Sequence, residues 1–504
     1  MKLQFDNIIL ISIDALRYDC VKYQKRKLIR KETLKKYLRT PTLNKLEKNA
    51  VCFTNAFSNA PYTTSAHAGL LAGTYPKIHG IRQMYYKGEK LNPRIASLAE
   101  HFKSEKYNTI ALSNPTLLEI FNKLELTREF NHTFSKDSEF AEFFIKDRSK
   151  KKFIFLHLFD VHAPYLHSES DIFVDNSDYY AEMEKLAMRH DMKLHDRFWK
   201  RKPYDVWQKV SKKVHWKRKA LLPLYLRGVS KFDQGRLRVL YDLLSKQLNM
   251  ERTIVFIFSD HGEGACDYFG PDAFGHAMHM ANDVIRVPIM IHNPKINHTI
   301  NNDLTSLMDL HKIIRKCSKP ISLRQLKEPN ISSKTVYAES WYYVNPKRKP
   351  QLKLSLRKKD YYLLERMIIK KGRKIILSFS PEKIIDKFEK FTLNRKSIGT
   401  FMKNLLYHNK WPSRQVRYLL YALAKFPFFG NKIALRILLS KKRYPIVFYS
   451  QLNSNMEEVK TITDVKSLNA KQLDEVIEGI DEIFKINKLK IKKNKISKFM
   501  KLLE

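Results

Sequence analysis

Three short apolar runs, each ending on an aspartate, constrain the fold of this chain more than any other feature. They are NIILISID (7–14), FIFLHLFD (153–160) and TIVFIFSD (253–260). Each run is rich in β-branched or aromatic residues and lacks apolar–polar alternation, which is typical of strands buried on both faces of a parallel sheet. A single aspartate at a strand end would be no more than a cap, but this ending occurs three times.

Further strands and helices are expected between these runs. Residues 107–114 and 286–294 have the composition of strands of the same kind, and residues 43–50 and 235–248 have helical patterns. The alternation predicts the α/β class: a doubly wound, mostly parallel sheet with helices on both faces, plus a smaller C-terminal region.

The three aspartates are expected to share one edge of that sheet, because ligands of such sheets bind beyond the carboxyl ends of the strands. Asp14, Asp160 and Asp260 would then face one crevice. Like charges at one edge repel each other unless protons or a cation compensate. We therefore expect Asp260 and the adjacent His261 to face a metal ion. The plainer alternative is a capping aspartate beside an incidental histidine.

Three consecutive hydroxyl residues, Thr63, Thr64 and Ser65, precede a helical pattern that Gly73 and Pro76 end. A hydroxyl at a helix N-terminus lies near unpaired backbone N–H groups and the positive end of the helix dipole. That environment favours an alkoxide and the oxyanions of a phosphate or sulfate ester. Taken alone, these residues are explained equally well by an ordinary N-cap.

Five segments follow one another in an order that resembles a known family. They are ILISIDALRYD, RTPTLNKLEKNAVCFTNAFSNAPYTTSAHAGLLAGTYPKIHG, FLHLFDVHAPY, FSDHGE and FGHAMHMANDVIRVPIMI, over roughly residues 5–294. LKLSLRKKDYYLLE (352–365) is similar to the C-terminal part of the same family. The chain resembles the sulfatase family of the alkaline phosphatase superfamily. The resemblance implies a metal-dependent enzyme that breaks or transfers phosphate or sulfate esters.

The resemblance assigns a metal site and a nucleophile. Carried over position by position, the metal ligands fall on Asp14, Thr63, Asp260 and His261, and Thr63 is also the catalytic nucleophile. The chain has Ala15 where many sulfatases carry a second metal-binding aspartate, and His261 where they carry an asparagine. Hard oxygens with one imidazole suit one Mn²⁺ or Zn²⁺ ion better than Ca²⁺, which stays an option.

The resemblance also assigns histidines to the ester. His162 and His276 match histidines that contact the ester oxygens or assist the leaving group, so both are expected in catalysis and substrate binding. His67 stands where sulfatases carry an arginine, in the Thr-x-x-x-His pattern of the family's phospho-transferring members, and is expected to bind substrate. A second metal at Asp160, His162 and His276, with His279 in reserve, is the alternative to a single ion.

The nucleophile departs from the sulfatase pattern. Sulfatases of the usual type carry a cysteine, occasionally a serine, that is converted to formylglycine, whereas this chain has Thr63. The aldehyde hydrate of formylglycine expels sulfate by collapsing back to the aldehyde, and a sulfo-threonine cannot do this. A phospho-threonine can instead be attacked at phosphorus by water or an alcohol. We therefore expect a hydrolase or transferase of phosphate esters with a covalent intermediate on Thr63. The alternatives are a sulfatase acting on an anionic glycan or similar ester, and a non-catalytic polyanion- or membrane-binding protein.

Several neighbouring residues are interpreted as structural. His157 lies inside a predicted strand and is interpreted as a core histidine, and Asp233 as a structural helix residue. Arg17, Tyr18 and Asp19 are expected to steady the first metal loop without taking part in catalysis.

The domain organisation follows from these segments and from charge. Residues 1–300 are predicted to form the catalytic domain, with an insertion at 166–222, and residues 301–380 to continue the family fold. Residues 381–450 hold 15 Lys and Arg against 3 Asp and Glu and are predicted to be a basic helical insertion, followed by a helical tail at 451–504. Such basic amphipathic helices lie on anionic membranes or polyanions, or have a basic face that is merely solvated.

Composition limits the partners and the compartment. The net charge of +43 favours an anionic ester substrate such as a glycan, lipid head group or nucleotide, and peripheral contact with an anionic membrane. No specific nucleic-acid recognition is predicted. The four cysteines form no CxxC pair, and neither a signal peptide nor a membrane-spanning run is recognised. These features predict a cytoplasmic protein, with peripheral membrane contact as an option.

Overall fold

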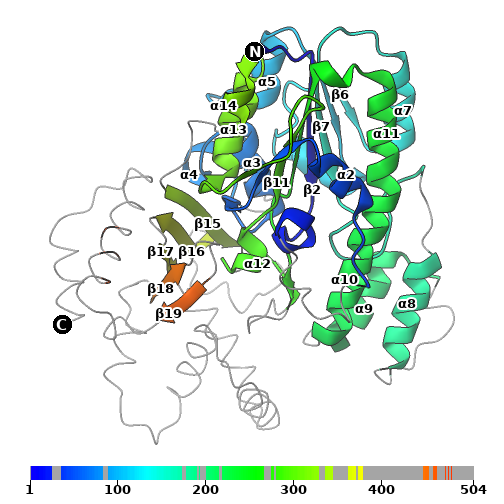
Figure 1. Cartoon of the computed structure of the whole chain (residues 1–504). Coiled ribbons are helices and arrows are strands. Elements are labelled where there is room, and N and C mark those ends of the chain that lie inside the picture. The colour runs from blue at the N-terminus through cyan, green and yellow to red at the C-terminus, as the bar shows by residue number, and fades with distance from the viewer. Residues whose placement is uncertain are drawn as a thin grey trace, which may run out of the picture. The chain divides into compact units, whose positions relative to one another are not determined.

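The computed structural model of the chain (Figure 1) forms two compact units. The first comprises Met1–Cys266, Ala273–His276 and Ala281–Ser333, and the second comprises Asp267–Asp272, Ala277–Met280 and Lys334–Glu504. The structure describes residues 2–24, 36–82, 89–172, 177–189, 192, 200–214, 218–265, 274–276, 280–327, 335–343, 361–370, 373–378, 446–452 and 458–462, and residues 472, 475 and 478.

The first unit is built on an eight-stranded, mostly parallel sheet in the order β12-β3-β11-β8-β2-β7-β5-β6. The three apolar runs that end on aspartates form its centre, with β2 paired in parallel to both β7 and β8. The strands are β2 (Asn7–Ile13), β3 (Ala50–Phe53), β5 (Asn108–Leu112), β6 (His132–Phe134), β7 (Lys152–Leu158), β8 (Thr253–Phe258), β11 (Ile289–His292) and β12 (Thr299–Asn301). The predicted fold class is confirmed. One detail is wrong: β11 is antiparallel to both β3 and β8.

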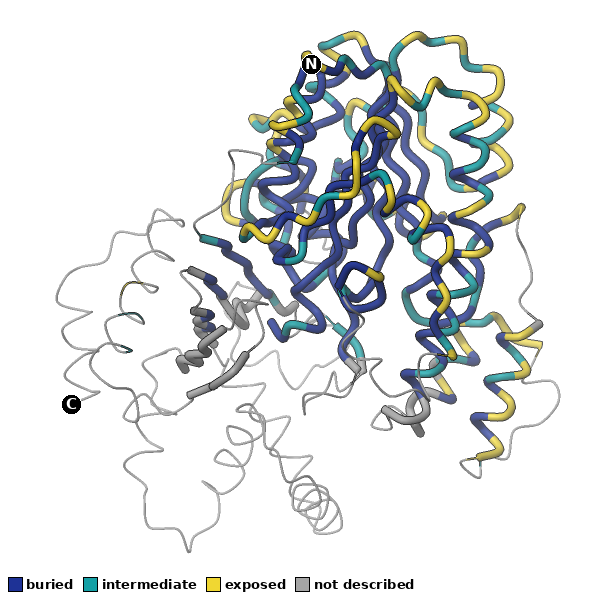
Figure 2. The backbone as a smooth tube through the Cα atoms, viewed as in Figure 1, coloured by how far each residue is buried: buried dark blue, intermediate teal, exposed yellow. Residues whose placement is uncertain are grey.

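Helices cover both faces of this sheet, as continuous apolar strands require. Ile9, Ile11 and Ile13 of β2 pack into one buried cluster, and Ile8 and Leu10 pack into the other. The central strands β2, β7 and β8 are accordingly buried along their length (Figure 2). The first cluster includes residues of α2 (Pro41–Glu47), α7 (Asp137–Lys146), α10 (Arg218–Phe232) and α11 (Arg238–Gln247), and the second includes residues of α3 (Thr63–Ala72), α5 (Leu98–Ser104), α6 (Pro115–Lys123) and α13 (Leu307–Lys316).

Helix α3 begins and ends where the sequence predicts. Thr63 is its first residue, and Gly73 follows its last with a left-handed backbone (φ +64°), which glycine adopts without steric cost. Pro76 then begins α4 (Pro76–His79). The N-terminus of α3, with Thr63, therefore lies at the carboxyl edge of the sheet.

The other predicted helices also form, with shifted bounds. The pattern at 43–50 gives α2, and the chain already enters β3 at Ala50. The pattern at 235–248 gives α11, preceded by a π-helical turn at Asp233–Leu237. The Asp233 carboxylate accepts hydrogen bonds from the Thr42 and Leu43 amides at the start of α2, which confirms its structural role.

The described part of the 166–222 insertion holds helices and irregular segments and no strand. Its helices are α8 (Ser177–Met188), α9 (Pro203–Val214) and the beginning of α10. The short elements of the first unit are β1 (Lys2–Leu3), β4 (Ala56–Phe57), β9 (Gly264–Ala265), β10 (Phe274–Gly275), β13 (Thr305–Ser306), β14 (Ile321–Ser322), α12 (Asn282–Ile285), α14 (Leu323–Lys327) and 3₁₀ turns at Tyr18–Cys20, Lys22–Gln24 and Met250–Arg252.

The second unit contains a five-stranded antiparallel sheet in the order β15-β16-β17-β18-β19. Its strands are β15 (Thr335–Tyr343), β16 (Tyr361–Lys370), β17 (Arg373–Ser378), β18 (Ile446–Leu452) and β19 (Glu458–Ile462). The predicted helical insertion and helical tail are therefore wrong at β18 and β19, although residues 472, 475 and 478 are helical. Residues 381–445 of the predicted insertion lie outside the described residues.

None of the helices that the structure describes is both long and apolar enough to cross a bilayer.

Candidate functional site

Two buried carboxylates lie side by side at the carboxyl edge of the sheet. Asp14 and Asp260 follow β2 and β8, which are parallel neighbours, so their side chains meet. The Ala15 amide donates to Asp260 Oδ1 across 3.3 Å and so ties the two loops together. Asp14 Oδ1 and Asp260 Oδ2 are buried and have no hydrogen-bond partner among the described residues. Orphaned buried carboxylate oxygens are costly unless a ligand binds them.

His261 adds a nitrogen to this pair. Its Nε2 lies 3.4 Å from Asp260 Oδ2 and 3.7 Å from Asp14 Oδ1. Its Nδ1 lies 2.9 Å from the Gly262 carbonyl oxygen, so Nδ1 carries the proton and Nε2 keeps a lone pair facing the carboxylates. Residue 262 must be glycine, because a Cβ there would lie 2.1 Å from the Asp283 carbonyl oxygen.

Thr63 completes the group from the N-terminus of α3. Its Oγ1 lies 3.1 Å from His261 Nε2 and 3.4 Å from Asp14 Oδ2. The structure thus brings together the four residues expected to bind metal, although they lie far apart in the chain.

The electrostatics of the site call for a cation. Burial, followed by the charge of Asp260, raises the pKa of Asp14 well above its usual range. Burial acts in the same direction on Asp260, but the adjacent His261, His67 and His157 together leave the pKa of that carboxyl lowered. Within the described residues, no lysine or arginine forms a hydrogen bond or ion pair with either carboxylate. Three oxygen-bearing side chains and one imidazole, with two orphaned oxygens, fit one divalent cation.

His67 lies one helical turn after Thr63 and is fully buried. Its Nδ1 donates to the Thr63 carbonyl oxygen across 2.8 Å, and its Nε2 accepts from Ser12 Oγ across 2.8 Å. Protein atoms therefore occupy both ring nitrogens. The expectation that His67 binds the ester does not fit this arrangement, because no nitrogen is left for a substrate oxygen.

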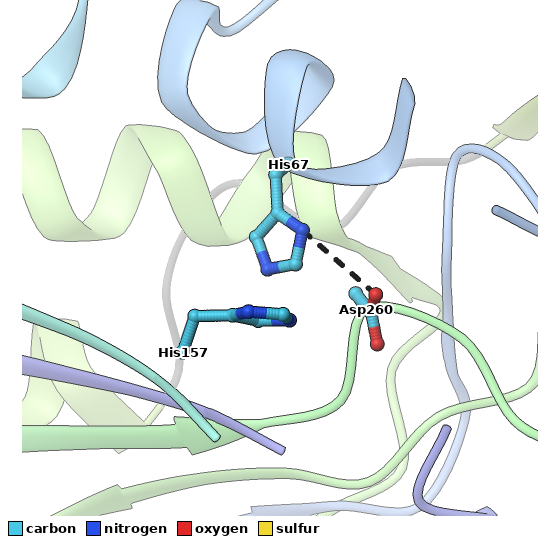
Figure 3. A group of neighbouring side chains, drawn as sticks. All are labelled: His67, His157 and Asp260. Carbon is cyan, nitrogen blue, oxygen red and sulfur yellow. Dashed lines mark ion pairs between the residues drawn. The ribbon is translucent and has the colours of Figure 1, made fainter. Parts of the chain in front are cut away.

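His157 is more than the core histidine that the sequence suggests. Its Nε2 lies 3.1 Å from Asp14 Oδ2 and its Nδ1 lies 3.1 Å from Ser113 Oγ. The rings of His67 and His157 meet edge to face, with centroids 4.7 Å apart, and Asp260 lies beside them (Figure 3). These three residues are close enough to hold an ion, but the nitrogens are already committed to hydrogen bonds, so they fit a metal less well than the first group.

His162 and His276 lie together, with ring centroids 5.0 Å apart, and His276 lies 4.2 Å from the His261 ring. His276 Nδ1 lies 3.1 Å from Glu263 Oε1, and the other oxygen of Glu263 accepts from the Tyr165 hydroxyl across 2.7 Å. His162 Nδ1 lies 2.7 Å from its neighbour's carbonyl oxygen. In both histidines Nδ1 is used internally, which leaves Nε2 for another partner. Glu263 and Tyr165 were not identified from the sequence.

Asp160 does not join a second metal site. Its carboxylate accepts from Arg236 Nη1 across 2.7 Å and from the Glu169 amide across 3.1 Å. Arg236 also forms two hydrogen bonds to Asp137. The described metal-binding groups do not include Asp160, so the alternative of a second metal at Asp160, His162 and His276 is not supported; His279 lies outside the described residues.

The loop after β2 is fastened as expected. Arg17 Nη1 donates to the Glu263 carbonyl oxygen across 2.6 Å, and the guanidinium pairs with Asp19. Tyr225, which the sequence analysis missed, accepts from the Arg17 amide and donates to the Ala15 carbonyl oxygen. This network joins the loop that carries Asp14 to the loop that carries His261.

Comparison with known proteins decides the family. The family model described as Sulfatase matches residues 6–314, more than half of the chain. The chain belongs to the sulfatase family. The resemblance drawn from its motifs is thereby confirmed, within the alkaline phosphatase superfamily of ester-cleaving, metal-dependent enzymes.

Individual relatives of this sulfatase-family chain are distant. The ulvan-active sulfatase of Formosa agariphila (strain DSM 15362 / KCTC 12365 / LMG 23005 / KMM 3901 / M-2Alg 35-1) is 43% identical over 74 residues, 14% of each protein, so the match spans only a small part of that relative. The phosphonate monoester hydrolase of Agrobacterium radiobacter has a TM-score of 0.52 at 15% identity, covering 74% of this chain and 87% of that one. A protein solved with its substrate D-glucosamine-2-N,6-O-disulfate has a TM-score of 0.51 at 14% identity, covering 75% and 89%. These two structures establish the fold.

Proposed function

We propose that this sulfatase-family protein is a metal-dependent hydrolase or transferase of phosphate esters, with Thr63 as its nucleophile. One observation carries the proposal: the Thr63 hydroxyl lies 3.1 Å from His261 Nε2 and 3.4 Å from Asp14 Oδ2, at the N-terminus of α3. A hydroxyl used only as an N-cap would need neither neighbour.

The metal ligands in this proposal are Asp14, Thr63, Asp260 and His261. When bound there, a divalent cation such as Mn²⁺ or Zn²⁺ lowers the pKa of the Thr63 hydroxyl and offsets negative charge on the ester. The helix N-terminus stabilises the same alkoxide through its unpaired N–H groups. The Thr63 oxygen then bonds to phosphorus as the bond from phosphorus to the leaving oxygen breaks, and the proton given up by the hydroxyl ends on the leaving oxygen, which leaves a phospho-threonine and an alcohol.

His276 and His162 serve the second step. Burial lowers the pKa of His276 to about 4 and that of His162 to about 3, so both rings are neutral near pH 7. With Nδ1 held internally, Nε2 is the atom that accepts a proton from the incoming water or alcohol. Water makes the protein a hydrolase, and an acceptor hydroxyl makes it a transferase. This is a different role from assistance to the leaving oxygen, which a neutral ring supports less well.

The charge of the site favours a monoanionic ester. Two carboxylates are balanced by one divalent cation, and no lysine or arginine among the described residues bonds to the candidate ligands Asp14, Thr63, Asp260 or His261. A dianionic phosphate monoester would bring an uncompensated charge into a buried site, which is costly. A phosphodiester or a phosphonate monoester brings one charge. Glycans, lipid head groups and nucleotides all contain such esters. A cytoplasmic location with peripheral membrane contact stays a prediction.

A sulfate ester is the second candidate, because it also carries one charge and because the curated relative is a sulfatase. Thr63 argues against it, since formylglycine cannot form from threonine. A panel of aryl phosphodiester, phosphonate monoester, phosphate monoester and sulfate substrates, with Mn²⁺, Zn²⁺ and Ca²⁺ in turn, separates the two. We expect turnover of the diester or phosphonate; turnover of the sulfate alone would contradict the proposal.

The nucleophile is tested with Thr63→Ala against the matched control Thr64→Ala. Both residues are buried neighbours on α3, but Thr64 Oγ1 has no hydrogen-bond partner within the described residues. We expect Thr63→Ala to lower kcat by at least about 10³-fold and Thr64→Ala to change it less than about threefold. Mass spectrometry of a quenched reaction should locate a phosphoryl group on Thr63. Equal activity of the two variants would exclude Thr63 as the nucleophile.

A further inference from the structure

His157 is a buried side chain to which the proposed reaction gives no role. It lies on β7 opposite Ser12 of β2, on the face of the sheet covered by α3. Both ring nitrogens contact polar atoms: Nε2 is 3.1 Å from Asp14 Oδ2, and Nδ1 is 3.1 Å from Ser113 Oγ. A histidine kept only for packing would not need a carboxylate partner.

The hydrogen bonds determine where the proton of His157 resides. When a cation is bound, the Asp14 carboxylate is ionised and only accepts hydrogen bonds, so His157 Nε2 carries the proton that points at Asp14. His157 Nδ1 faces the Ser113 hydroxyl, which can donate to a ring nitrogen that carries no proton. Nδ1 is then an acceptor, and the Ser113 hydroxyl donates to it. Ser113 therefore selects the tautomer that lets His157 hold Asp14.

The two oxygens of Asp14 have different surroundings as a result. Oδ2 is held by His157 and lies 3.4 Å from Thr63 Oγ1. Oδ1 has no hydrogen-bond partner in the part of the chain that the structure describes, and it lies 3.7 Å from His261 Nε2. Rotation of the carboxyl group would break the bond to His157, so Oδ1 stays on the side of the other ligands.

We propose that His157, held by Ser113, is a positioning residue for Asp14 that fixes the carboxylate so that Oδ1 is presented to the cation. The inference rests on the proposed metal site and concerns how tightly that site binds, independently of the ester. Residues that hydrogen-bond to a metal ligand and orient it commonly contribute about 10- to 100-fold to the affinity for the metal.

The test is a titration of the full-length, chelator-stripped protein with Mn²⁺, measured as a dissociation constant. We expect His157→Phe to raise the Kd by about 10- to 100-fold. His157→Gln should restore it to within about fivefold of the unsubstituted protein, because the glutamine amide can donate from near the place of Nε2. Ser113→Ala should raise the Kd in the same direction by less than His157→Phe.

His292→Phe is the matched control. His292 is a buried histidine in β11 of the same sheet, with Nδ1 bound to the Leu46 carbonyl oxygen and Nε2 3.1 Å from the Tyr241 hydroxyl. Its loss removes a buried imidazole and two hydrogen bonds without touching a candidate ligand. We expect it to lower thermal stability as His157→Phe does, but to leave the Kd for Mn²⁺ within about twofold.

The outcomes are distinct. A Kd within about twofold for His157→Phe, or equal losses in His157→Phe and His292→Phe, would overturn the inference. If His157→Phe does not fold, His157→Gln and Ser113→Ala decide, and unchanged affinity in Ser113→Ala overturns the role of that serine. Failure of the unsubstituted protein to bind Mn²⁺, Zn²⁺ or Ca²⁺ would overturn the metal site itself.

Discussion

Asp260 and Asp160 follow strands of the same sheet in the same sequence pattern, but their carboxylates have different partners. Each follows a buried parallel strand, β8 or β7, and each is almost inaccessible to solvent. Asp160 is bound by the guanidinium of Arg236, which also binds Asp137. Asp260 Oδ1 accepts hydrogen bonds from the amides of His261 and Ala15, while Oδ2 has no hydrogen-bond partner among the residues that the structure describes.

The difference lies in the source of the compensating charge. Arg236 is part of the chain, in the π-helical turn before α11, so Asp160 has a permanent positive partner, which it shares with Asp137. Asp260 and Asp14 share a site with no such side chain among the described residues, so their compensation must come from protons or a removable cation. An acid at the end of a strand is therefore a candidate ligand only if no arginine or lysine reaches it.

Exchanging each aspartate for asparagine gives the largest expected contrast. Asp260→Asn should abolish measurable Mn²⁺ binding and lower turnover of a phosphodiester by at least about 10²- to 10³-fold, since it removes a ligand. Asp160→Asn should leave the Kd for Mn²⁺ unchanged and lower only the stability. Metal titration and kcat of both purified variants check this. Loss of metal binding in Asp160→Asn would place Asp160 in the metal site. Asp160 would then be a metal ligand like Asp260 and not only a partner of Arg236.

Removing the guanidinium of Arg236 should destabilise the fold without changing metal binding. Arg236→Met leaves Asp137 and Asp160 buried and unpaired, which costs about 3–5 kcal/mol of the free energy of unfolding. Urea denaturation of the metal-saturated protein measures this loss. The triple variant Asp137→Asn, Asp160→Asn, Arg236→Met should recover part of it, because no buried charge is then left. A loss below about 1 kcal/mol in Arg236→Met would mean that water compensates both acids.

The sheet and the four candidate ligands could be predicted because each has a local signal. Apolar runs without alternation predicted the central strands, and Asp14, Asp260 and His261 stand directly after them. The helix start indicated Thr63, Thr64 and Ser65 together, and the resemblance to the sulfatase family singled out Thr63. The antiparallel direction of β11 could not be read from its sequence, because a strand buried on both faces has the same composition in either direction.

The supporting residues could not be predicted because their partners come from distant elements. Arg236 neutralises Asp160 from a turn 76 residues away in sequence. His157 reaches Asp14 only because β7 pairs with β2 in a register that sets Ser12 beside it. One signal was present: a histidine in an otherwise apolar strand needs polar partners wherever it is buried. Most of β18 was missed because basic charge suggested amphipathic helices at 381–450, and β19 lies in the segment 451–504 that was predicted to be a helical tail.

The smallest expected effect is a pH dependence of stability. It is expected at the Asp14–Asp260 pair, with which no lysine or arginine among the described residues is paired. Burial and the charge of Asp260 raise the pKa of Asp14 in the folded, metal-free protein above its value in the unfolded chain. The folded state then holds this proton more tightly. Its contribution to stability is fully present below the unfolded pKa and is lost as pH rises through the folded pKa.

Metal-free protein should therefore lose stability relative to Asp14→Asn as pH rises from 5 to 7, by up to about 1.4 kcal/mol per pH unit. Saturating Mn²⁺ should remove this slope, because the carboxylate is then a ligand and holds no proton. Urea denaturation of both proteins at three pH values, with and without Mn²⁺, measures the difference. Parallel stability profiles of the two metal-free proteins would show that Asp14 is ionised without a cation. The site would then be compensated within the chain, as Asp160 is.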